Sequence, residues 1–135
     1  MSALIRIDPR WPGAWGAVRG FLQDALERGN GYKDWSLEDF REAAVSGHVA
    51  LWGLVDNNHV YGAGVTAVTH YPQRRVLEVI AFGCERGTEE QWLSLREHFL
   101  ELARSFGCSA ILGTGRPGWA RKLGAEERRV FEVAV

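Results

Sequence analysis

Two cysteines and four histidines are the residue types in this chain best suited to metal binding or nucleophilic chemistry. Their spacing contains no CxxC pair and no HExxH sequence, the arrangements that commonly hold zinc, so we expect no metal ion. Cys84 follows an apolar stretch and could act as an acyl-accepting nucleophile, but no pattern of histidine and acid surrounds it. We expect Cys84 and Cys108 to be free thiols in the core, with a single bridge between them as the alternative.

Basic residues at one predicted turn form a second group that could bind a charged partner. His70, Arg74 and Arg75 flank this turn with Tyr71, and they could contact phosphate or an acidic protein. The charge of the whole chain argues against nucleic acid, because 16 Lys and Arg are balanced by 17 Asp and Glu, giving a net charge of −1. A solvated turn is the simpler interpretation, and a nucleic-acid binder is a further hypothesis that rests on these arginines alone.

The length of 135 residues and the 46% apolar composition predict one domain, residues 1–135, with a core that needs no disulfide or metal. The chain does not begin with a basic segment followed by an apolar run. No stretch reaches the roughly 18 apolar residues needed to cross a bilayer. We therefore expect a cytoplasmic protein without a membrane partner.

Apolar periodicity predicts an α/β (α+β) chain in the order β-α-α-β-β-β-α-β-α-β. Helical spacing predicts helices at residues 15–26, 37–45, 92–106 and 117–124. Alternating or continuous apolar runs predict strands at residues 3–8, 49–55, 60–71, 75–82, 109–112 and 128–135. Ser36 and Asp39 form a candidate capping box before the second helix, and Gly62 and Gly64 indicate a bulge or a close backbone approach.

This order of elements resembles that of the GCN5-related N-acetyltransferase (GNAT) superfamily over nearly the whole chain. The most specific stretches are ARSFGC at residues 103–108 and GRPGWARKLG at residues 115–124. They match the family's helix end and fifth strand, and the KLG that follows its fourth helix. The second stretch also resembles small GNAT-like proteins encoded by tailed phages. The resemblance implies a mixed central sheet and, in active members, transfer of an acetyl group from acetyl-CoA to an amine.

In that family the long helix begins at a [QR]-x-x-G-x-[GA] loop whose backbone N–H groups bind the pyrophosphate of CoA. The matching residues are GTEEQW at 87–92, so Glu90 and Trp92 stand where the family has small residues. Glu90 would place a carboxylate beside the phosphates, and like charges about 4 Å apart repel by about 1 kcal/mol even in water. Acetyl-CoA in the usual pose is therefore disfavoured. A loop of different register could still bind acyl-CoA, and its candidate residues are Phe82, Gly83, Cys84, Arg86 and Gly87.

The catalytic residues that the resemblance implies are also incomplete. Ala120 occupies the position of a frequent tyrosine general acid, and the neighbouring Trp119 cannot lose its N–H proton usefully near pH 7. Glu78 matches a carboxylate that family members often keep in the fourth strand as a general base, and burial would raise its pKa toward a useful value. The alternative is that Glu78 pairs with an arginine such as Arg75 or lies at a strand edge.

Six tryptophans are many for one domain of this size. Three lie in apolar patterns that predict core positions: Trp15, Trp52 and Trp92. The other three lie in or beside loops, where exposed aromatic rings often mark recognition surfaces: Trp11, Trp35 and Trp119. We therefore carry two hypotheses. One is a divergent, phage-encoded GNAT-fold protein with a degenerate acyl-CoA site that acts through contacts with another protein, and the other is an active N-acetyltransferase with an unorthodox pyrophosphate loop.

Overall fold

The computed structural model describes residues 1–29, 33–114 and 118–135, apart from the side chain of Trp119. Gly31 and Pro117, predicted at helix ends, lie outside these residues. Within them the elements follow in this order: β1 (Ser2–Ile7), α1 (Ala14–Gly29), α2 (Leu37–Ser46), β2 (Ala50–Asp56), β3 (His59–His70), β4 (Arg75–Cys84), α3 (Glu89–Leu93), α4 (Arg96–Ser105), β5 (Ala110–Gly113) and α5 (Trp119–Leu123).

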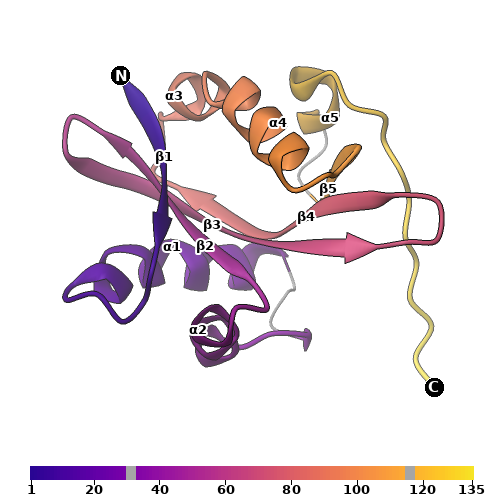
Figure 1. The fold of residues 1–135 in the computed structure, drawn as a ribbon, viewed down its shortest axis with the longest axis horizontal. Helices are drawn as coiled ribbons and strands as arrows, with labels where there is room; N and C mark the ends of the chain where they lie inside the picture. Colours follow the sequence, from indigo (N-terminus) through magenta and orange to yellow (C-terminus); the bar gives the residue numbers. More distant parts are fainter. Residues whose placement is uncertain (30–32, 115–117) are drawn as a thin grey trace.

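The strands form one five-stranded sheet in the order β1-β2-β3-β4-β5. Neighbouring strands are antiparallel except β4 and β5, which are parallel because α3 and α4 form the crossover between them. In Figure 1, α1 and α2 lie on one side of the sheet and α3, α4 and α5 on the other. The predicted fold class, α+β with a mixed sheet, is confirmed.

The face under α1 and α2 carries the largest group of buried apolar side chains. It is centred on Leu22 of α1 and Phe40 of α2, both fully buried, which pack against strand residues such as Val65 and Ala81. The predicted capping box is present, because the Ser36 hydroxyl accepts from the Asp39 N–H at 3.1 Å and the Asp39 carboxylate accepts from the Ser36 N–H at 2.8 Å. The helix α2 therefore begins where its sequence indicates.

The opposite face differs from the prediction of one helix over residues 92–106. Two helices, α3 and α4, are separated by a turn at Ser94 and Leu95. The Ser94 hydroxyl donates to the Gln91 carbonyl at 2.6 Å, and the Leu95 N–H donates to the Trp92 carbonyl three residues back. A serine that competes for the helix's own carbonyl favours such a tightened turn.

Two irregularities change the direction of side chains along the central strands. The register shifts between Leu54 and Val55, where Tyr61 of β3 is the extra residue, and again between Val65 and Thr66, where Ile80 of β4 is extra. The predicted close approach at Gly62 is present, since a Cβ there would lie 2.9 Å from the Cβ of Cys84. The bulge at Ile80 leaves Ala81 facing α1 while Phe82 faces α3 and α4.

The predicted final strand at residues 128–135 is wrong for this chain in isolation. Residues 125–135 form neither helix nor strand, and Figure 1 shows them leaving α5, passing the level of the sheet near the β3–β4 hairpin and ending on its other side. The alternation that predicted a strand is present in the sequence, but no neighbouring strand pairs with it. A strand needs a partner for its backbone N–H and C=O groups, and local pattern alone does not supply one.

Candidate functional site

The fourth strand positions Glu78, the candidate general base, on a solvent-exposed part of the sheet. Glu78 lies opposite Ala67 of β3, and its Oε2 accepts a hydrogen bond from the Thr69 hydroxyl at 3.2 Å. Glu78 is therefore exposed, and the burial expected of a general base is not present. Arg75 does not serve as its ion-pair partner in the contacts described, because its Nη1 lies 3.4 Å from the carbonyl oxygen of Phe106.

The strands β4 and β5 stay together over a short length only. β5 pairs with residues Val76 to Val79 and ends at Gly113, whereas β4 continues to Cys84. Beyond Val79, the pairing described for β4 is with β3. This is the part of the sheet where a ligand could enter between the two strands, so the side chains around residues 80–84 decide whether it can.

Aromatic side chains fill the α3 and α4 side of this region. The Phe82 ring lies 5.6 Å from the Trp92 ring and 6.4 Å from the Phe99 ring, in edge-to-face arrangements of 68° and 69°. Trp92 is only 7% exposed and shares a buried cluster with Leu54 and Tyr61. The Trp92 indole, expected to obstruct a phosphate loop, is thus directed into the core and helps to hold α3 on the sheet.

Tyr61 in the same cluster is a buried phenol that the sequence analysis did not single out. Its hydroxyl donates to the Ser2 hydroxyl at 3.0 Å. Burial raises the pKa of Tyr61, and the nearby Asp56 carboxylate raises it further, against an opposing effect of the hydrogen bond with Ser2. Tyr61 is therefore neutral near pH 7 and serves as a structural hydrogen-bond donor.

Gly83, a candidate cofactor residue, is occupied in packing against α1. A Cβ at this position would lie 2.4 Å from the carbonyl oxygen of Phe21, closer than real Cβ contacts. The space beside the Gly83 backbone, which a phosphate would need for close contact, is therefore occupied by the backbone of α1. Beside it, a hollow of about 470 Å³ lies between α1 and the end of β4, lined by Gly16 and Gly20 and by Cys84, Glu85 and Arg86.

The loop between β4 and α3 is held in place by contacts with β3 and by a hydrogen bond within the loop. The Glu85 carboxylate pairs with His59 Nε2 at 2.5 Å, and the Glu85 N–H donates to the Tyr61 carbonyl at 2.8 Å. The Thr88 hydroxyl donates to the Glu85 carbonyl at 2.6 Å, so it does not cap the helix that follows. Arg86 is exposed, and Gly87 has a φ of +77° with open space where a Cβ would be.

The helix that follows this loop does not resemble a phosphate-binding helix. α3 has only five residues, and its first turn carries the carboxylates of Glu89 and Glu90. Glu89 forms an ion pair with Lys122 of α5, and Arg96 Nε donates to the Leu123 carbonyl at 3.0 Å. These ties join α5 to α3 and α4. Because the paired residues are 33 and 27 positions apart, no local sequence spacing could have indicated them.

The fit of these residues to CoA is poor. In the pose that the family resemblance implies, the phosphates would face the carboxylates in the first turn of α3, and Lys122 beside them is already paired with Glu89. Phe82 packs against Trp92, and Gly83 packs against α1. Of the five candidate residues, Arg86 and Gly87 keep their side-chain positions open to solvent.

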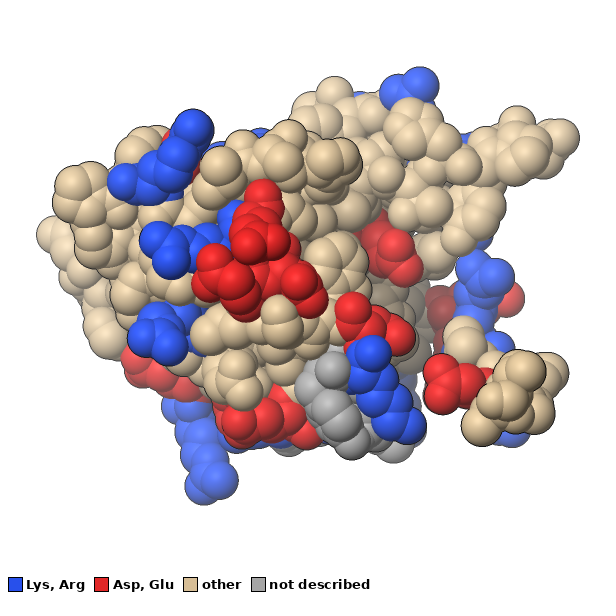
Figure 2. Space-filling model, turned by 90° about the horizontal axis from the view of Figure 1, so that it is seen from below, with Lys and Arg blue, Asp and Glu red and all other residues tan. Residues whose placement is uncertain are grey.

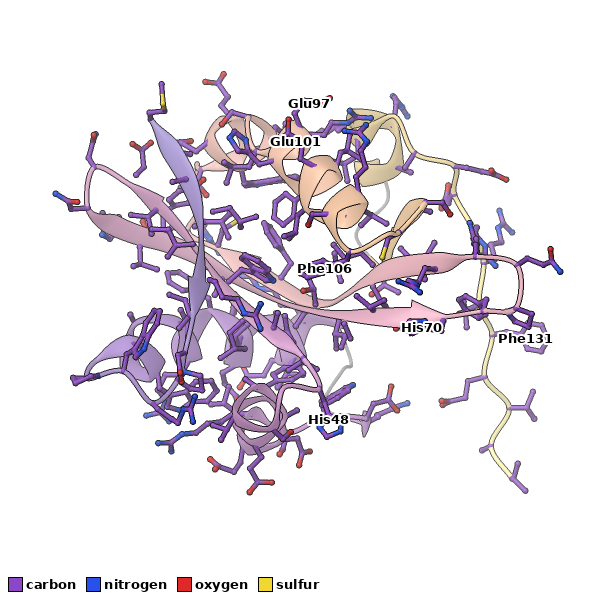
Figure 3. All side chains as sticks on the ribbon, in the orientation of Figure 1. His48, His70, Glu97, Glu101, Phe106 and Phe131 are labelled. Atoms are coloured by element: carbon purple, nitrogen blue, oxygen red, sulfur yellow. The ribbon has the colours of Figure 1, made fainter. Side chains whose placement is uncertain are left out.

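The remaining candidates lie apart from one another. Cys84 packs against the cluster around Tyr61 and Trp92, and Cys108 is buried as predicted. Both are free thiols. His48 follows α2 and His70 ends β3, at separate places in Figure 3. In the part of the chain that is described, no three His, Cys, Asp or Glu come together as a metal site, and no helix is long and apolar enough to cross a membrane.

The side chain of Trp119 lies outside the described residues, and the other tryptophans differ from the prediction at one position. Trp52 is buried, its Nε1 donating to the Thr66 hydroxyl at 2.8 Å, and Trp15 packs beside the core. Trp11 is 53% exposed. Trp35, expected at a recognition surface, is instead half-buried and stacks on Phe40 with ring centroids 5.2 Å apart.

Acidic side chains gather on the face of the molecule that carries α1 and α2 (Figure 2). A hollow of about 440 Å³ on this face is lined by Trp35 and by the carboxylates of Asp34, Asp39 and Glu42. Asp39 is engaged in the capping box. The hollow is therefore formed by α2 and the residues just before it. It lies on the opposite side of the sheet from Phe82 and Trp92.

Solved structures of acetyltransferases share this fold. An aminoglycoside acetyltransferase, meta-AAC0020, from an uncultured soil metagenomic sample in complex with sisomicin is 13% identical, with a TM-score of 0.69 over 99% of this chain and 95% of that chain. Aminoglycoside N-acetyltransferase AAC(6')-Iy in complex with CoA is 12% identical, with a TM-score of 0.68 over 100% of this chain and 95% of that chain.

A predicted acetyltransferase from Clostridium acetobutylicum, solved with acetyl-CoA, is 12% identical, with a TM-score of 0.67 over 99% of this chain and 96% of that chain. The sequence itself matches no family model and no curated relative. Likeness at these identities concerns the backbone, and it confirms the GNAT fold that the order of elements suggested.

Proposed function

We propose that this chain uses the acetyltransferase fold as a binding scaffold, with a degenerate acyl-CoA site, and that it acts through contacts with another protein. The observation that carries the proposal is the placement of Trp92, whose indole lies in the core at the helix that would otherwise bind pyrophosphate. The Glu89–Lys122 ion pair supports the same conclusion, because it links α3 to α5 across the helix end.

An exposed aromatic residue on an ordered turn supports the protein-contact part of the proposal. Trp11 follows β1, and its N–H donates to the Asp8 carbonyl while its own carbonyl accepts from Ala14, both at 3.0 Å. Arg10 donates side-chain and backbone hydrogen bonds to the Asp8 carboxylate, which lowers the pKa of Asp8 to about 2. The turn thus presents a large apolar ring at little further entropic cost, as recognition sites commonly do.

The origin and location are also proposals. The GRPGWARKLG stretch at residues 115–124 resembles small phage-encoded proteins. A phage protein with a scaffold role would meet its partner in the host cytoplasm or in the virion. The partner would then be a host or phage protein with an apolar recess that accommodates the Trp11 ring.

A second function is favoured by one observation. β4 runs past the end of β5, from Ile80 to Cys84, as a strand must if a ligand is to enter between the two. An acetyl-CoA-dependent N-acetyltransferase would use this opening with an unorthodox loop that includes Arg86 and Gly87. Glu78 would be its candidate base.

A thermal-shift titration with acetyl-CoA separates the two functions. We expect no change in Tm at millimolar acetyl-CoA. A ligand present at about 100 times its Kd would add about 2.7 kcal/mol, which corresponds to several degrees in a domain of this size. A shift of that size would contradict the scaffold proposal. Its loss in Gly87→Asp would then assign binding to the loop, and Glu78→Gln would be expected to lower turnover more than cofactor binding.

Co-purification tests the protein contact. We expect Trp11→Ala to lose a partner that the wild-type chain retains, because an exposed hot-spot aromatic contributes about 2 kcal/mol or more to an interface. Tyr71→Ala is the matched control, since Tyr71 is similarly exposed but lies at the far tip of the β3–β4 hairpin. Equal recovery of the partner with Trp11→Ala and wild type would contradict the assignment of Trp11.

A further inference from the structure

The first strand, β1, is an open edge of the sheet. In the described part of the chain it pairs with β2 only, over residues Ser2 to Ile7, so the N–H and C=O groups on its outer side have no strand beside them. In Figure 1 β1 crosses in front of the other strands, and no other labelled element is drawn over it. An exposed edge of six residues is a template on which another strand can pair.

The features that commonly protect a sheet edge are missing from β1. The strand contains no proline, and its register with β2 is continuous from Ser2 to Ile7, without a bulge. Its one charged side chain, Arg6, is directed back over the sheet, because its guanidinium lies 5.5 Å from the centre of the Trp52 ring on β2. The charge that could have guarded the edge is therefore held over the neighbouring strand.

Apolar side chains beside this edge are incompletely covered. Ile5 is 42% exposed, and on β2 it lies opposite Gly53, which has no side chain to cover it. Ile5 shares a face with Ile7, and Ile7 packs against the core under α1 and α2. A strand added beside β1 would place side chains next to Ile5 and extend that apolar face outward.

The sequence of β1 fits an antiparallel copy of itself. With a two-fold axis perpendicular to the sheet at Leu4, Ile5 of each copy lies opposite Ala3 of the other, and Arg6 lies opposite Ser2. The two Arg6 residues are then four positions apart along the strand, about 13 Å. An axis at Ile5 halves that separation and brings like charges together, so the register centred on Leu4 is favoured.

The charges in this register are complementary. Ser2 lies opposite Asp56 of β2, and its hydroxyl contacts Asp56 Oδ2 at 3.5 Å. Because residues opposite one another share a face, Arg6 of each copy would project on the face that carries the Asp56 carboxylate of the other. Opposite charges meet at two symmetric places while like charges stay apart, which favours a second copy over an unrelated strand.

We propose that two copies of this chain pair through β1, antiparallel and around a two-fold axis at Leu4, so that their sheets join into one. The pairing uses the β1 edge of both copies, and association through this edge therefore stops at two. The proposal does not depend on the scaffold function, because it involves neither α3 nor the Trp11 ring.

The first test measures the mass of the full chain by light scattering after size exclusion, over about a hundredfold range of concentration. Wild type is expected to be a dimer. Ile5→Lys, which places a charge beside the edge, is expected to be a monomer that remains folded by circular dichroism. Val45→Lys is the matched control, because Val45 is 45% exposed on α2, and it is expected to stay dimeric. Amide hydrogen exchange in residues 2–7 should be slower in wild type than in Ile5→Lys.

A charge reversal tests the register. Arg6→Glu should raise the Kd of the dimer about tenfold or more, because the new carboxylate would face Asp56 of the other copy. Adding Asp56→Arg reverses both charges and should return the Kd to within about threefold of wild type. A role of Arg6 confined to its contact with Trp52 would not be rescued in this way.

Three outcomes would overturn the proposal. A wild-type monomer over the whole range of concentration would mean that β1 does not pair with a second copy. A dimer that survives Ile5→Lys, or that Val45→Lys disrupts equally, would not have its interface at the β1 edge. A Kd for the double charge reversal as weak as that of Arg6→Glu would exclude the register centred on Leu4.

Discussion

The two faces of the sheet are closed by different means. On one face, the 16-residue helix α1 and the 10-residue helix α2 cover a continuous core, and α2 is bounded by a full capping box and by Gly47 in the left-handed conformation. On the other, α3 and α5 have five residues each, and α3, α4 and α5 begin without a side-chain capping hydrogen bond. The second face therefore depends on the Phe82–Trp92–Phe99 cluster and on long-range polar ties.

The difference bears directly on function. The face that depends on the aromatic cluster is the one into which Phe82 projects, on the part of β4 that extends beyond β5. Two of its three helices have only five residues, so releasing the side chains that hold α3 in place would reduce stability. This arrangement supports the proposed scaffold role over a loop that must admit phosphates.

The largest expected effect tests whether Trp92 is a core residue. Trp92→Ala should reduce the free energy of unfolding by about 3–5 kcal/mol, because a buried indole and its contacts with Phe82 are lost. Urea denaturation followed by circular dichroism measures the change. Trp11→Ala is the control, and it should cost less than about 0.5 kcal/mol as an exposed surface substitution. If the two variants were equally stable, Trp92 would not hold α3 on the sheet.

A second substitution tests how tightly α1 is seated on β4. Gly83→Ala should destabilise the protein by about 1–3 kcal/mol, because the added Cβ would lie 2.4 Å from the Phe21 carbonyl oxygen and α1 would have to move. Gly20→Ala on the same helix meets nothing within 4 Å and should stabilise by about 0.5–1 kcal/mol. Equal stability of the two variants in urea would contradict a close contact at Gly83.

The better-predicted face is the one stabilised by local signals. The Ser36–Asp39 box and the break between the strands predicted at residues 49–55 and 60–71, where Asn57 and Asn58 form the turn, each depend on residues close together in the sequence, and each is present. Both asparagines have positive φ, which this residue type tolerates best after glycine. Local chemistry of this kind can be predicted without knowledge of the fold.

The less well-predicted features have two different causes. The break at Ser94 is local, because the Ser94 hydroxyl donates to the Gln91 carbonyl, but the apolar periodicity of residues 92–106 does not reveal that choice. The alternation at residues 128–135 predicted a strand, and a strand depends on a distant partner that the described residues do not provide. At the candidate site, Glu90 and Trp92 could be identified as departures from the family pattern. Only the structure shows that the Trp92 indole is buried and that the Gly83 backbone packs closely against α1.

The capping box provides a smaller effect on the face that holds α2. Ser36→Ala should cost about 1 kcal/mol, since the Asp39 N–H loses its acceptor at a helix start. Thermal or urea unfolding at pH 7 measures it. Thr88→Ser, at a helix start where the side chain does not cap, is the comparison and should change stability by less than about 0.5 kcal/mol. If Ser36→Ala lowered the free energy of unfolding no more than Thr88→Ser does, the side-chain cap of α2 would not contribute to stability. The proposed difference in capping between the two faces would then be wrong.

The same box should give stability a dependence on acidic pH. The Ser36 N–H and hydroxyl bond to the Asp39 carboxylate and lower its pKa below the ordinary 3.8. Because the unfolded chain then binds the proton more tightly, this contribution is present above pH 3.8 and is lost as the pH falls through the lower folded value. The difference in the free energy of unfolding between wild type and Asp39→Asn should therefore disappear in acid. Glu38→Gln, in the same turn, controls for loss of charge, and a gap that persists in strong acid would contradict the mechanism.

The smallest effect concerns the tie between α5 and α3. Lys122→Ala should reduce stability by only about 0.2–1 kcal/mol, because both partners of the Glu89 ion pair are about half exposed and water screens them. The loss should shrink further in high salt. Arg96→Ala removes a hydrogen bond to the Leu123 carbonyl and should cost about 0.5–1.5 kcal/mol. The part of this cost that salt reduces should be small, because the ion pair that Arg96 also forms with Glu97 is exposed. If Lys122→Ala proved the more costly of the two, the ion pair would be the stronger link between α5 and the rest of its face. Its removal would then be the first change to make in any attempt to open the side of the sheet that carries α3, α4 and α5.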